Sequence, residues 1–157
     1  MPLLYLIRHA KAGHRQRWEG PDHVRPLTRS GRRQAEALVE QFRDAPFTRL
    51  VSSPYVRCRQ TLEPLSRERG LPVEDAGELE EGVGANETFR LISALGADDG
   101  GPVALSTHGD IMENVLDRLA THGVKLDGPV AFEKGCTWVL DVAGGEVTGA
   151  RYVPPPS

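Results

Sequence analysis

The sequence predicts an α/β domain with a mostly parallel central sheet covered by helices on both faces. Short apolar runs at residues 3–7, 49–52 and 103–106 have the length of buried strands, and amphipathic helical segments lie between them. Strands that alternate with crossover helices form parallel sheets with both faces covered. We therefore expect a three-layer α/β/α sandwich, with residues 1–153 as one domain and residues 154–157 as a flexible tail.

Each element has its own signal in the sequence. A helix capped by Thr28 is expected to reach about residue 44, because apolar residues recur there at helical spacing. After the strand at 49–52, a helix is expected to open at Pro54 and to stop at Gly70. The remaining expected elements are a strand at 71–75, a helix from Asn86 to about Gly96, a strand at 103–106, a helix at 111–122 and a hairpin of residues 138–142 and 147–153.

Composition and charge narrow the class of protein. The formal charge of −3 argues against a general nucleic-acid binder. Basic residues nevertheless crowd the first quarter of the chain, where they form either a solvated surface or a positive field that attracts an anionic substrate. No apolar stretch approaches the roughly 20 residues that span a bilayer. Two distant cysteines, Cys58 and Cys136, indicate reduced thiols. We therefore expect a cytoplasmic protein without membrane association, and most simply a monomer.

Three polar clusters each follow one of the expected strands. They are Arg8-His9, residues 52–57 (Ser-Ser-Pro-Tyr-Val-Arg) and residues 106–110 (Ser-Thr-His-Gly-Asp). The carboxyl ends of parallel strands lie side by side, and open α/β sheets bind their ligands at that edge. We therefore expect the arginines and histidines of these clusters to converge on one cavity, namely Arg8, His9, Arg57 and His108.

The convergence of two guanidiniums and two imidazoles predicts a phosphoryl group among them. Arg8 and Arg57 can hold its oxygens with fixed hydrogen bonds, and His108 can donate to another oxygen. The arginines disfavour the charged form of His9, which leaves one ring nitrogen free to attack phosphorus and form a phosphohistidine. Because the same cations stabilise the charge in both steps, neither a metal ion nor a cofactor is expected.

The leaving group needs a proton, so we expect one carboxyl group at the rim of the pocket. Glu81 is the first candidate, and its neighbour Glu80 is better interpreted as a solvated acid. Asp110 is a competing candidate, because it follows the third cluster so closely. Further substrate-binding hydrogen bonds are expected from Ser53 and Thr107 and from backbone amides at the helix starts.

At these residues the sequence resembles the histidine phosphatase superfamily, also called the phosphoglycerate-mutase-like family. The matching segments, in the order of the family, are Arg-His-Ala at 8–10, Leu-Thr-x-x-Gly-x-x-Gln-Ala at 27–35, Ser-Ser-Pro with Arg at 52–57, Leu-x-Glu at 79–81 and His-Gly at 108–109. The resemblance implies a phosphoglycerate mutase-like fold. It implies His9 as phosphoryl acceptor, a phosphate pocket of Arg8, Arg57 and His108, and Glu81 as proton donor.

The Arg-His-Ala-Lys-Ala form and the short length look most like small SixA-type phosphohistidine phosphatases. They also resemble the phosphatase domain that follows a Nudix domain in some actinobacterial hydrolases. Only one helix fits between Glu81 and the strand at 103–106, so an uncapped, open pocket is expected. The resemblance implies a metal-independent phosphatase that acts on a phosphorylated small molecule or a phosphohistidine-containing protein. The alternatives are a phosphotransferase or mutase of the same chemistry, and a non-catalytic phosphate-binding regulatory module.

Overall fold

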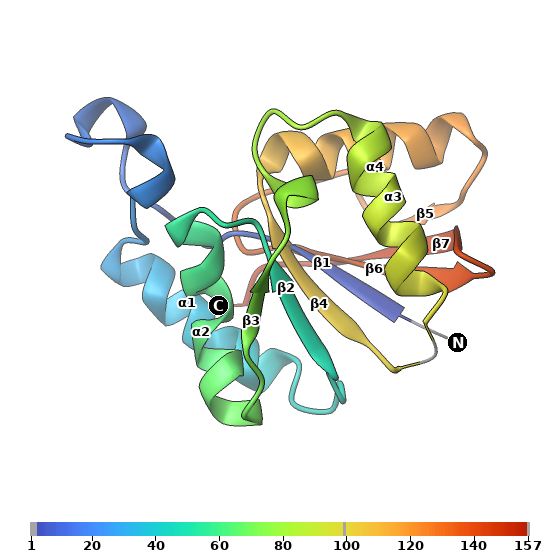
Figure 1. Cartoon of the computed structure of the whole chain (residues 1–157), viewed down its shortest axis with the longest axis horizontal. Coiled ribbons are helices and arrows are strands. Elements are labelled where there is room, and N and C mark those ends of the chain that lie inside the picture. Colours follow the sequence, from blue (N-terminus) through green and yellow to red (C-terminus); the bar gives the residue numbers. More distant parts are fainter. Residues whose placement is uncertain (1–2, 99, 157) are drawn as a thin grey trace.

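The computed structural model of the chain describes residues 3–98 and 100–156 (Figure 1). Its strands are β1 (Leu3–Arg8), β2 (Arg49–Ser52), β3 (Val73–Asp75), β4 (Val103–Thr107), β5 (Leu126–Asp127), β6 (Thr137–Ala143) and β7 (Glu146–Val153). Its α-helices are α1 (Arg29–Gln41), α2 (Val56–Arg69), α3 (Ala85–Gly96) and α4 (Gly109–Thr121). Three short 3₁₀ helices are η1 (Arg15–Arg17), η2 (Asp22–Val24) and η3 (Gly77–Leu79).

The strands form a sheet in the order β3-β2-β4-β1-β6-β7-β5. β1 and β4, β2 and β4, β2 and β3, and β5 and β7 pair in parallel. β6 is antiparallel to both of its neighbours, β1 and β7. The predicted hairpin is therefore confirmed, and it joins the rest of the sheet through the pairing of β6 with β1. The two-residue strand β5 at the far edge was not predicted, because so short a segment has no recognisable period.

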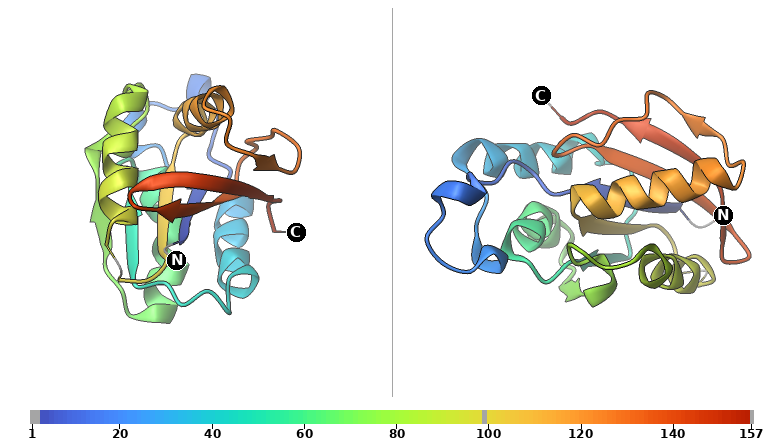
Figure 2. Two further views of the ribbon diagram at one scale, coloured as in Figure 1. Left: turned by 90° about the vertical axis from the view of Figure 1, so that its right-hand side faces the viewer. Right: turned by 90° about the horizontal axis from the view of Figure 1, so that it is seen from above.

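Helices cover both faces of this sheet, because alternate residues of each buried strand point to opposite sides. Leu6 and Leu105 pack into a core with residues of α3 and α4. Ile7, Leu50 and Ala104 pack into a second core with residues of α1 and α2. Figures 1 and 2 show the two helix pairs on opposite sides of the sheet. The predicted three-layer α/β/α architecture is confirmed.

Each of the first two long helices differs from its predicted bounds at one end. Thr28 caps α1 as predicted, since its hydroxyl accepts a hydrogen bond from Gly31 N, but the helix ends at Gln41 rather than near residue 44. α2 begins at Val56 rather than at Pro54, because Tyr55 keeps extended backbone angles. It stops as predicted at Gly70, whose φ of +66° suits glycine.

Later elements differ from prediction by a few residues. β3 starts at Val73 rather than at residue 71, because Leu71 N donates back to Ser66 O at the end of α2 and Pro72 has no N–H. Asn86 lies inside α3 and does not cap it; its side chain instead accepts a hydrogen bond from Arg118. α4 begins two residues earlier than predicted, at Gly109.

The expected tail begins with Pro154, whose carbonyl oxygen accepts a hydrogen bond from Gln41 Nε2 at 2.9 Å. This contact ties the start of the tail to the end of α1. Ser157 lies outside the described residues. No helix within residues 3–98 and 100–156 has the length and apolarity needed to cross a membrane.

The carboxyl ends of β2, β4 and β1 lie side by side at one edge of the sheet. Arg8 pairs with Thr107 in register, and Ser52 pairs with Ser106. The ladder continues past the strand ends, since His9 N donates to Thr107 O at 2.9 Å. The loop that joins β1 to α1 projects beyond this edge (Figure 1) and carries η1 and η2. The three polar clusters therefore meet, as the parallel topology predicts.

Candidate active site

A cavity of about 460 Å³ opens at this edge of the sheet. Its lining includes Arg8, His9, Arg57, Glu81 and Asp110 among the residues expected from the sequence. It also includes Lys11, His14, Arg15, Arg25, Gly109, Glu113, Phe132 and Lys134. His108, Ser53 and Thr107 are fully buried and do not line it.

His9 is held in one tautomer at the base of the cavity. Its Nδ1 lies 2.8 Å from the carbonyl oxygen of Ala10, and because a carbonyl oxygen only accepts, Nδ1 carries the proton. In the neutral ring the lone pair is then on Nε2. Burial is the main cause that lowers the pKa of His9 well below its ordinary value, and Arg57, His108 and Arg8 lower it further. The ring is therefore neutral at physiological pH.

Arg8 lies against the first turn of α4. Its Nη1 donates to the carbonyl oxygen of Phe132 at 2.7 Å, and its buried Nε has no hydrogen-bond partner among the described residues. A Cβ added to Gly109 would lie 2.7 Å from Cζ of Arg8, so a larger residue there would displace the guanidinium from this position. Arg8 also makes no ion pair with a described residue, which leaves its charge available to a bound anion.

Arg57 is only 1% exposed, and its end groups contact an acid of the long loop. Nη1 donates to the carbonyl oxygen of Asp22 at 2.9 Å, and Nη2 donates to Asp22 Oδ2 at 3.1 Å. Glu81 Oε1 lies 3.5 Å from the same Nη2. The buried Nε of Arg57 has no partner among the described residues. Arg57 is therefore paired in part and retains an unsatisfied buried donor.

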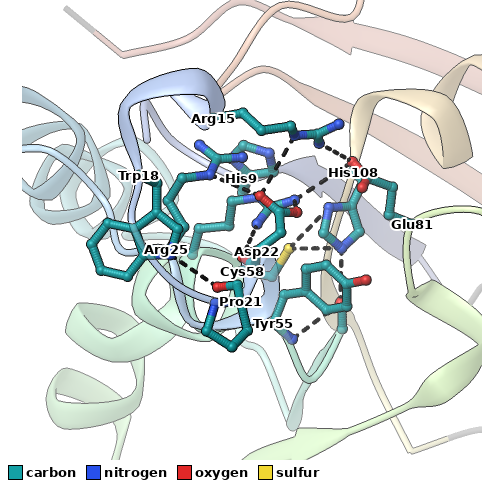
Figure 3. A network of polar contacts seen from close by, with 12 residues as sticks. His9, Arg15, Trp18, Pro21, Asp22, Arg25, Tyr55, Cys58, Glu81 and His108 are labelled. Atoms are coloured by element: carbon teal, nitrogen blue, oxygen red, sulfur yellow. Dashed lines mark hydrogen bonds and ion pairs between the residues drawn. The ribbon is translucent and has the colours of Figure 1, made fainter. Parts of the chain in front are cut away.

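Asp22 joins the arginines of the loop to the site, as Figure 3 shows. Its Oδ1 accepts from Arg25 Nε at 3.0 Å and lies 3.5 Å from Arg15 Nε. Burial raises the pKa of Asp22, but hydrogen bonds and charges from Arg25 and Arg57 outweigh it and bring this pKa below its usual value. The carboxylate is therefore ionised and occupies the side of Arg57 that faces the loop.

His108 packs beside His9 with ring centroids 5.6 Å apart, and the ring of Tyr55 crosses it at 4.7 Å. Its Nε2 lies 2.9 Å from Ser53 Oγ and 3.5 Å from Cys58 Sγ. Burial, followed by the charge of Arg57, lowers the pKa of His108 to about 4. His108 thus adjoins the expected nucleophile as a neutral ring, behind the cavity wall rather than on it.

The structure does not place Ser53 and Thr107 where a substrate would contact them, contrary to expectation. Ser53 Oγ is beside His108 and also accepts a hydrogen bond from Tyr55 N at 3.3 Å. Thr107 Oγ1 donates to the carbonyl oxygen of Leu79 at 2.8 Å. Both hydroxyls therefore support neighbouring segments: Ser53 orients the imidazole, and Thr107 holds the segment that leads to Glu81.

Both candidate proton donors line the cavity, whereas Glu80 does not. Glu81 Oε1 accepts a hydrogen bond from Arg15 Nη2 at 2.7 Å. Asp110 Oδ2 accepts from Gly82 N at 2.8 Å, which ties the Glu81 loop to the start of α4. The geometry brings both carboxylates to the rim and leaves both as candidates.

Sequence reasoning did not single out Asp22, Tyr55 and Lys134 at this site. Asp22 and Lys134 come from segments without periodicity that are distant in the chain, so only the folded structure shows that they meet the cavity. Asp22 satisfies Arg25, a buried arginine that needs an anionic partner, but the burial of Arg25 is itself visible only in the folded structure. The two cysteines form no disulfide, as expected, and both are buried; burial raises the pKa of Cys58 to about 12.

No group of three or more His, Cys, Asp or Glu side chains with the arrangement of a metal site occurs in residues 3–98 and 100–156. The hydrogen-bond donors that line the cavity are guanidiniums (Arg8, Arg15, Arg25 and Arg57), ammonium groups (Lys11 and Lys134) and imidazoles (His9 and His14). Such donors bind phosphate-like oxyanions.

The chain belongs to the histidine phosphatase superfamily (branch 1), whose family model matches residues 4–92. This segment contains the Arg8-His9 pair, Arg57 and Glu81. The family membership predicted from the motifs is thereby confirmed. This match and the relatives described next support a phosphatase.

A relative from Mycolicibacterium smegmatis, named 8-oxo-(d)GTP phosphatase, is 36% identical over 155 residues. The match covers 96% of this chain and 48% of the relative, so the chain spans about half the length of the curated relative. Among solved structures, the protein histidine phosphatase SixA complexed with tungstate has a TM-score of 0.78 at 20% identity, covering 99% of this chain and 96% of that chain. A phosphohistidine phosphatase SixA described as putative, from Agrobacterium tumefaciens, has a TM-score of 0.66 at 29% identity, covering 88% and 90%.

Proposed function

We propose that the protein is a metal-independent phosphatase that transfers the phosphoryl group of its substrate to His9 and then to water. The observation that carries this proposal is the tautomer of His9, whose Nδ1 is occupied by the carbonyl oxygen of Ala10 at 2.8 Å. The lone pair on Nε2 is therefore available for attack on phosphorus. Splitting one displacement into two easier steps is the advantage of such a covalent intermediate.

Arg8 and Arg57 are the proposed phosphoryl clamp. Each has a buried Nε without a partner among the described residues, and a phosphoryl oxygen would satisfy such a donor. Their charges stabilise the equatorial oxygens in both steps, as phosphoryl transfer requires. His108 is proposed to hold the imidazole of His9 in place and to reach the bound group when the surrounding loop adjusts.

The proton donor is proposed to be Glu81. Its carboxylate lies 3.5 Å from Arg57 Nη2, next to the place where a bound phosphoryl oxygen would be. The carboxylate of Asp110 is instead engaged by a backbone amide, which suits a positioning role. In the second step the same carboxyl group, now deprotonated, would take a proton from the attacking water.

The substrate is proposed to be a phosphomonoester or a protein phosphohistidine. The likeness to the SixA protein from Agrobacterium tumefaciens supports the second, since that protein is named as a phosphohistidine phosphatase. The relative named as an 8-oxo-(d)GTP phosphatase supports a phosphorylated nucleotide as a small-molecule alternative, whose terminal phosphate is held by an anhydride bond. The single helix between Glu81 and β4 leaves no large cap, which is compatible with either bulky substrate.

The test measures phosphate release by the wild type and by His9→Ala with EDTA present, on p-nitrophenyl phosphate and a phosphohistidine protein. We expect His9→Ala to lose at least about 10³-fold in rate. His122→Ala, a change of an exposed histidine at the end of α4, is the comparison variant and should release phosphate at the wild-type rate. Equal rates for wild type and His9→Ala would contradict the proposal.

Rapid acid quench then looks for the intermediate. A phosphohistidine is labile in acid and stable in alkali, so labelled phosphate should remain on the wild type after alkaline denaturation and should be absent from His9→Ala. Good turnover without any labelled enzyme would indicate direct attack by water and would overturn the covalent mechanism.

A further inference from the structure

The positive charges that line the cavity are not all neutralised. Arg15, Arg25 and Arg57 each form an ion pair with Asp22 or Glu81. The three other cations of the lining make no ion pair with any residue in the described part of the chain, and these are Arg8, Lys11 and Lys134. Arg8 belongs to the proposed phosphoryl clamp. Lys11 and Lys134 have no role in that clamp.

One side chain of α1 fixes the backbone of both lysines. Gln34 Oε1 accepts a hydrogen bond from Lys11 N at 3.2 Å, and Gln34 Nε2 donates to Lys134 O at 3.1 Å. The residue after Lys134 is Gly135, at φ +84°, where an added Cβ would lie 2.4 Å from Gln34 Cδ. Two segments that are distant in sequence are therefore held together at the mouth of the cavity.

The lysine ammonium groups also lie within one field of positive charge. Burial is the first cause that lowers the pKa of Lys134, followed by the charges of Arg8, Arg25 and Lys11. Like charges gathered around one cavity repel each other unless an anion binds among them. Carboxylates of Asp110 and Glu113 also line this cavity, but neither forms an ion pair with Arg8, Lys11 or Lys134 among the described residues.

We propose that Lys11 and Lys134 form a second anion subsite, which binds the inner phosphate of a substrate whose terminal phosphate is transferred to His9. The substrate class is then an organic diphosphate, such as a nucleoside diphosphate. This inference rests on the proposed phosphatase function and specifies its substrate.

Charge matching supports a diphosphate. Its terminal phosphate carries up to two negative charges and its inner phosphate one more, which equals the positive charge of Arg8, Lys11 and Lys134 together. A lysine is suited to the inner phosphate, because its flexible stem lets a point charge follow an oxygen that has no fixed fork geometry.

The chemical step is balanced without a further reactant. His9 Nε2 forms a bond to the terminal phosphorus while the bond from that phosphorus to the bridging oxygen breaks, and the electron pair stays on the bridging oxygen. The organic monophosphate leaves, with its charge held by the two lysines. Water then attacks the phosphohistidine and gives orthophosphate, returning Nε2 to its neutral form.

The kinetic test compares ADP with p-nitrophenyl phosphate, which has no second anion. We expect Lys11→Met and Lys134→Met each to lower kcat/KM for ADP by about tenfold, mainly through KM, and to change kcat/KM for p-nitrophenyl phosphate by less than about threefold. The chain has one other lysine, Lys125, exposed near β5, and Lys125→Met is the matched control. Equal losses on both substrates, or an equal loss in Lys125→Met, would overturn the subsite.

A binding test separates this inference from the proposed reaction. In His9→Ala, titration calorimetry should give at least tenfold tighter binding of pyrophosphate than of orthophosphate, and the double Lys11→Met, Lys134→Met change should remove that preference. If the wild type hydrolyses p-nitrophenyl phosphate but the two anions bind equally, the subsite is wrong and the phosphatase function stands. If the preference is present but no phosphoester is hydrolysed, the function is wrong and the subsite stands.

Discussion

The carboxylate of Asp22 lies 3.1 Å from Nη2 of Arg57 and thereby covers one edge of the guanidinium that is proposed to bind phosphate. The backbone carbonyl of Asp22 accepts a second hydrogen bond from Arg57, at 2.9 Å. The long loop between β1 and α1 therefore supplies both an acceptor that orients Arg57 and a negative charge that competes with an incoming oxyanion.

Asp22→Asn should tighten the binding of inorganic phosphate. The amide keeps the shape of the side chain and removes the charge that a phosphate oxygen must displace from Arg57. The expected gain is about fivefold in the competitive inhibition constant of phosphate, which corresponds to roughly 1 kcal/mol for one charge-assisted contact. The inhibition constant is measured from the inhibition of p-nitrophenyl phosphate hydrolysis by added phosphate.

Glu19→Gln is the control for this change, since Glu19 is an exposed acid of the same loop. It removes the same charge from the same segment and should leave the inhibition constant within about twofold. Weaker phosphate binding in Asp22→Asn would mean that the carboxylate is needed to orient Arg57 and does not compete with the ligand.

The two buried histidines should make stability depend on pH between neutral and mildly acidic conditions. Burial lowers the pKa of folded His108 to about 4, against an ordinary value of 6.5. Between these values the unfolded chain binds a proton that the folded chain does not, so stability is full above pH 6.5 and is lost as the pH falls. From pH 7 to pH 5, His108 alone should cost about 2 kcal/mol of unfolding free energy.

Urea denaturation of the wild type, His108→Asn and His122→Asn at both pH values checks this expectation. His122 is exposed at the end of α4, so its variant should keep the wild-type difference between the two pH values. His108→Asn should show a difference smaller by about 2 kcal/mol, whatever its absolute stability. An unchanged difference in His108→Asn would show that this histidine is not the neutral buried group described above.

The convergence of Arg8, His9 and Arg57 could be predicted because it depends only on strand ends. In a parallel sheet each strand brings its last residues to the same edge. An apolar run followed by polar residues is therefore sufficient to predict that those residues lie at this edge. The direction of a short hydroxyl side chain is different. Ser53 and Thr107 stand at those same ends, yet they turn to nearby protein groups, and no sequence pattern encodes that choice.

The contribution of the long loop could not be predicted for a second reason. Residues 9–28 have neither helical nor strand periodicity, so nothing in their order indicates which side chains return to the sheet edge. The structure brings Asp22 and Arg15 back onto Arg57 and Glu81 through side-chain ion pairs. Such contacts depend on the tertiary path of the loop, which propensities do not specify.

Gly109→Ala should lower activity while leaving the fold stable. Alanine favours a helix over glycine by up to about 1 kcal/mol, so α4 itself tolerates the change. The new Cβ would lie 2.7 Å from Arg8 Cζ, however, and the guanidinium must move away from it. We expect kcat/KM to fall by about tenfold or more with little change in Tm. Gly84→Ala is the matched control, since Gly84 precedes α3 and a Cβ there meets nothing within 4 Å.

The choice between Glu81 and Asp110 as proton donor can be decided by the basicity of the leaving group. An alkyl phosphate needs protonation as its oxygen leaves, whereas p-nitrophenolate leaves readily without it. Loss of the general acid should therefore lower kcat/KM by about 10²- to 10⁴-fold for the alkyl ester and far less for p-nitrophenyl phosphate.

We expect Glu81→Gln to show this dependence on the leaving group, because Glu81 lies beside Arg57 at the place proposed for the phosphoryl oxygens. Asp110→Asn should instead lower kcat/KM for both esters by a similar factor. Asp110 acts on the site through its hydrogen bond from Gly82 N, which holds the loop that carries Glu81. A larger loss on the alkyl ester in Asp110→Asn than in Glu81→Gln would assign the donor to Asp110, and Glu81 would then serve to balance the charges of Arg15 and Arg57.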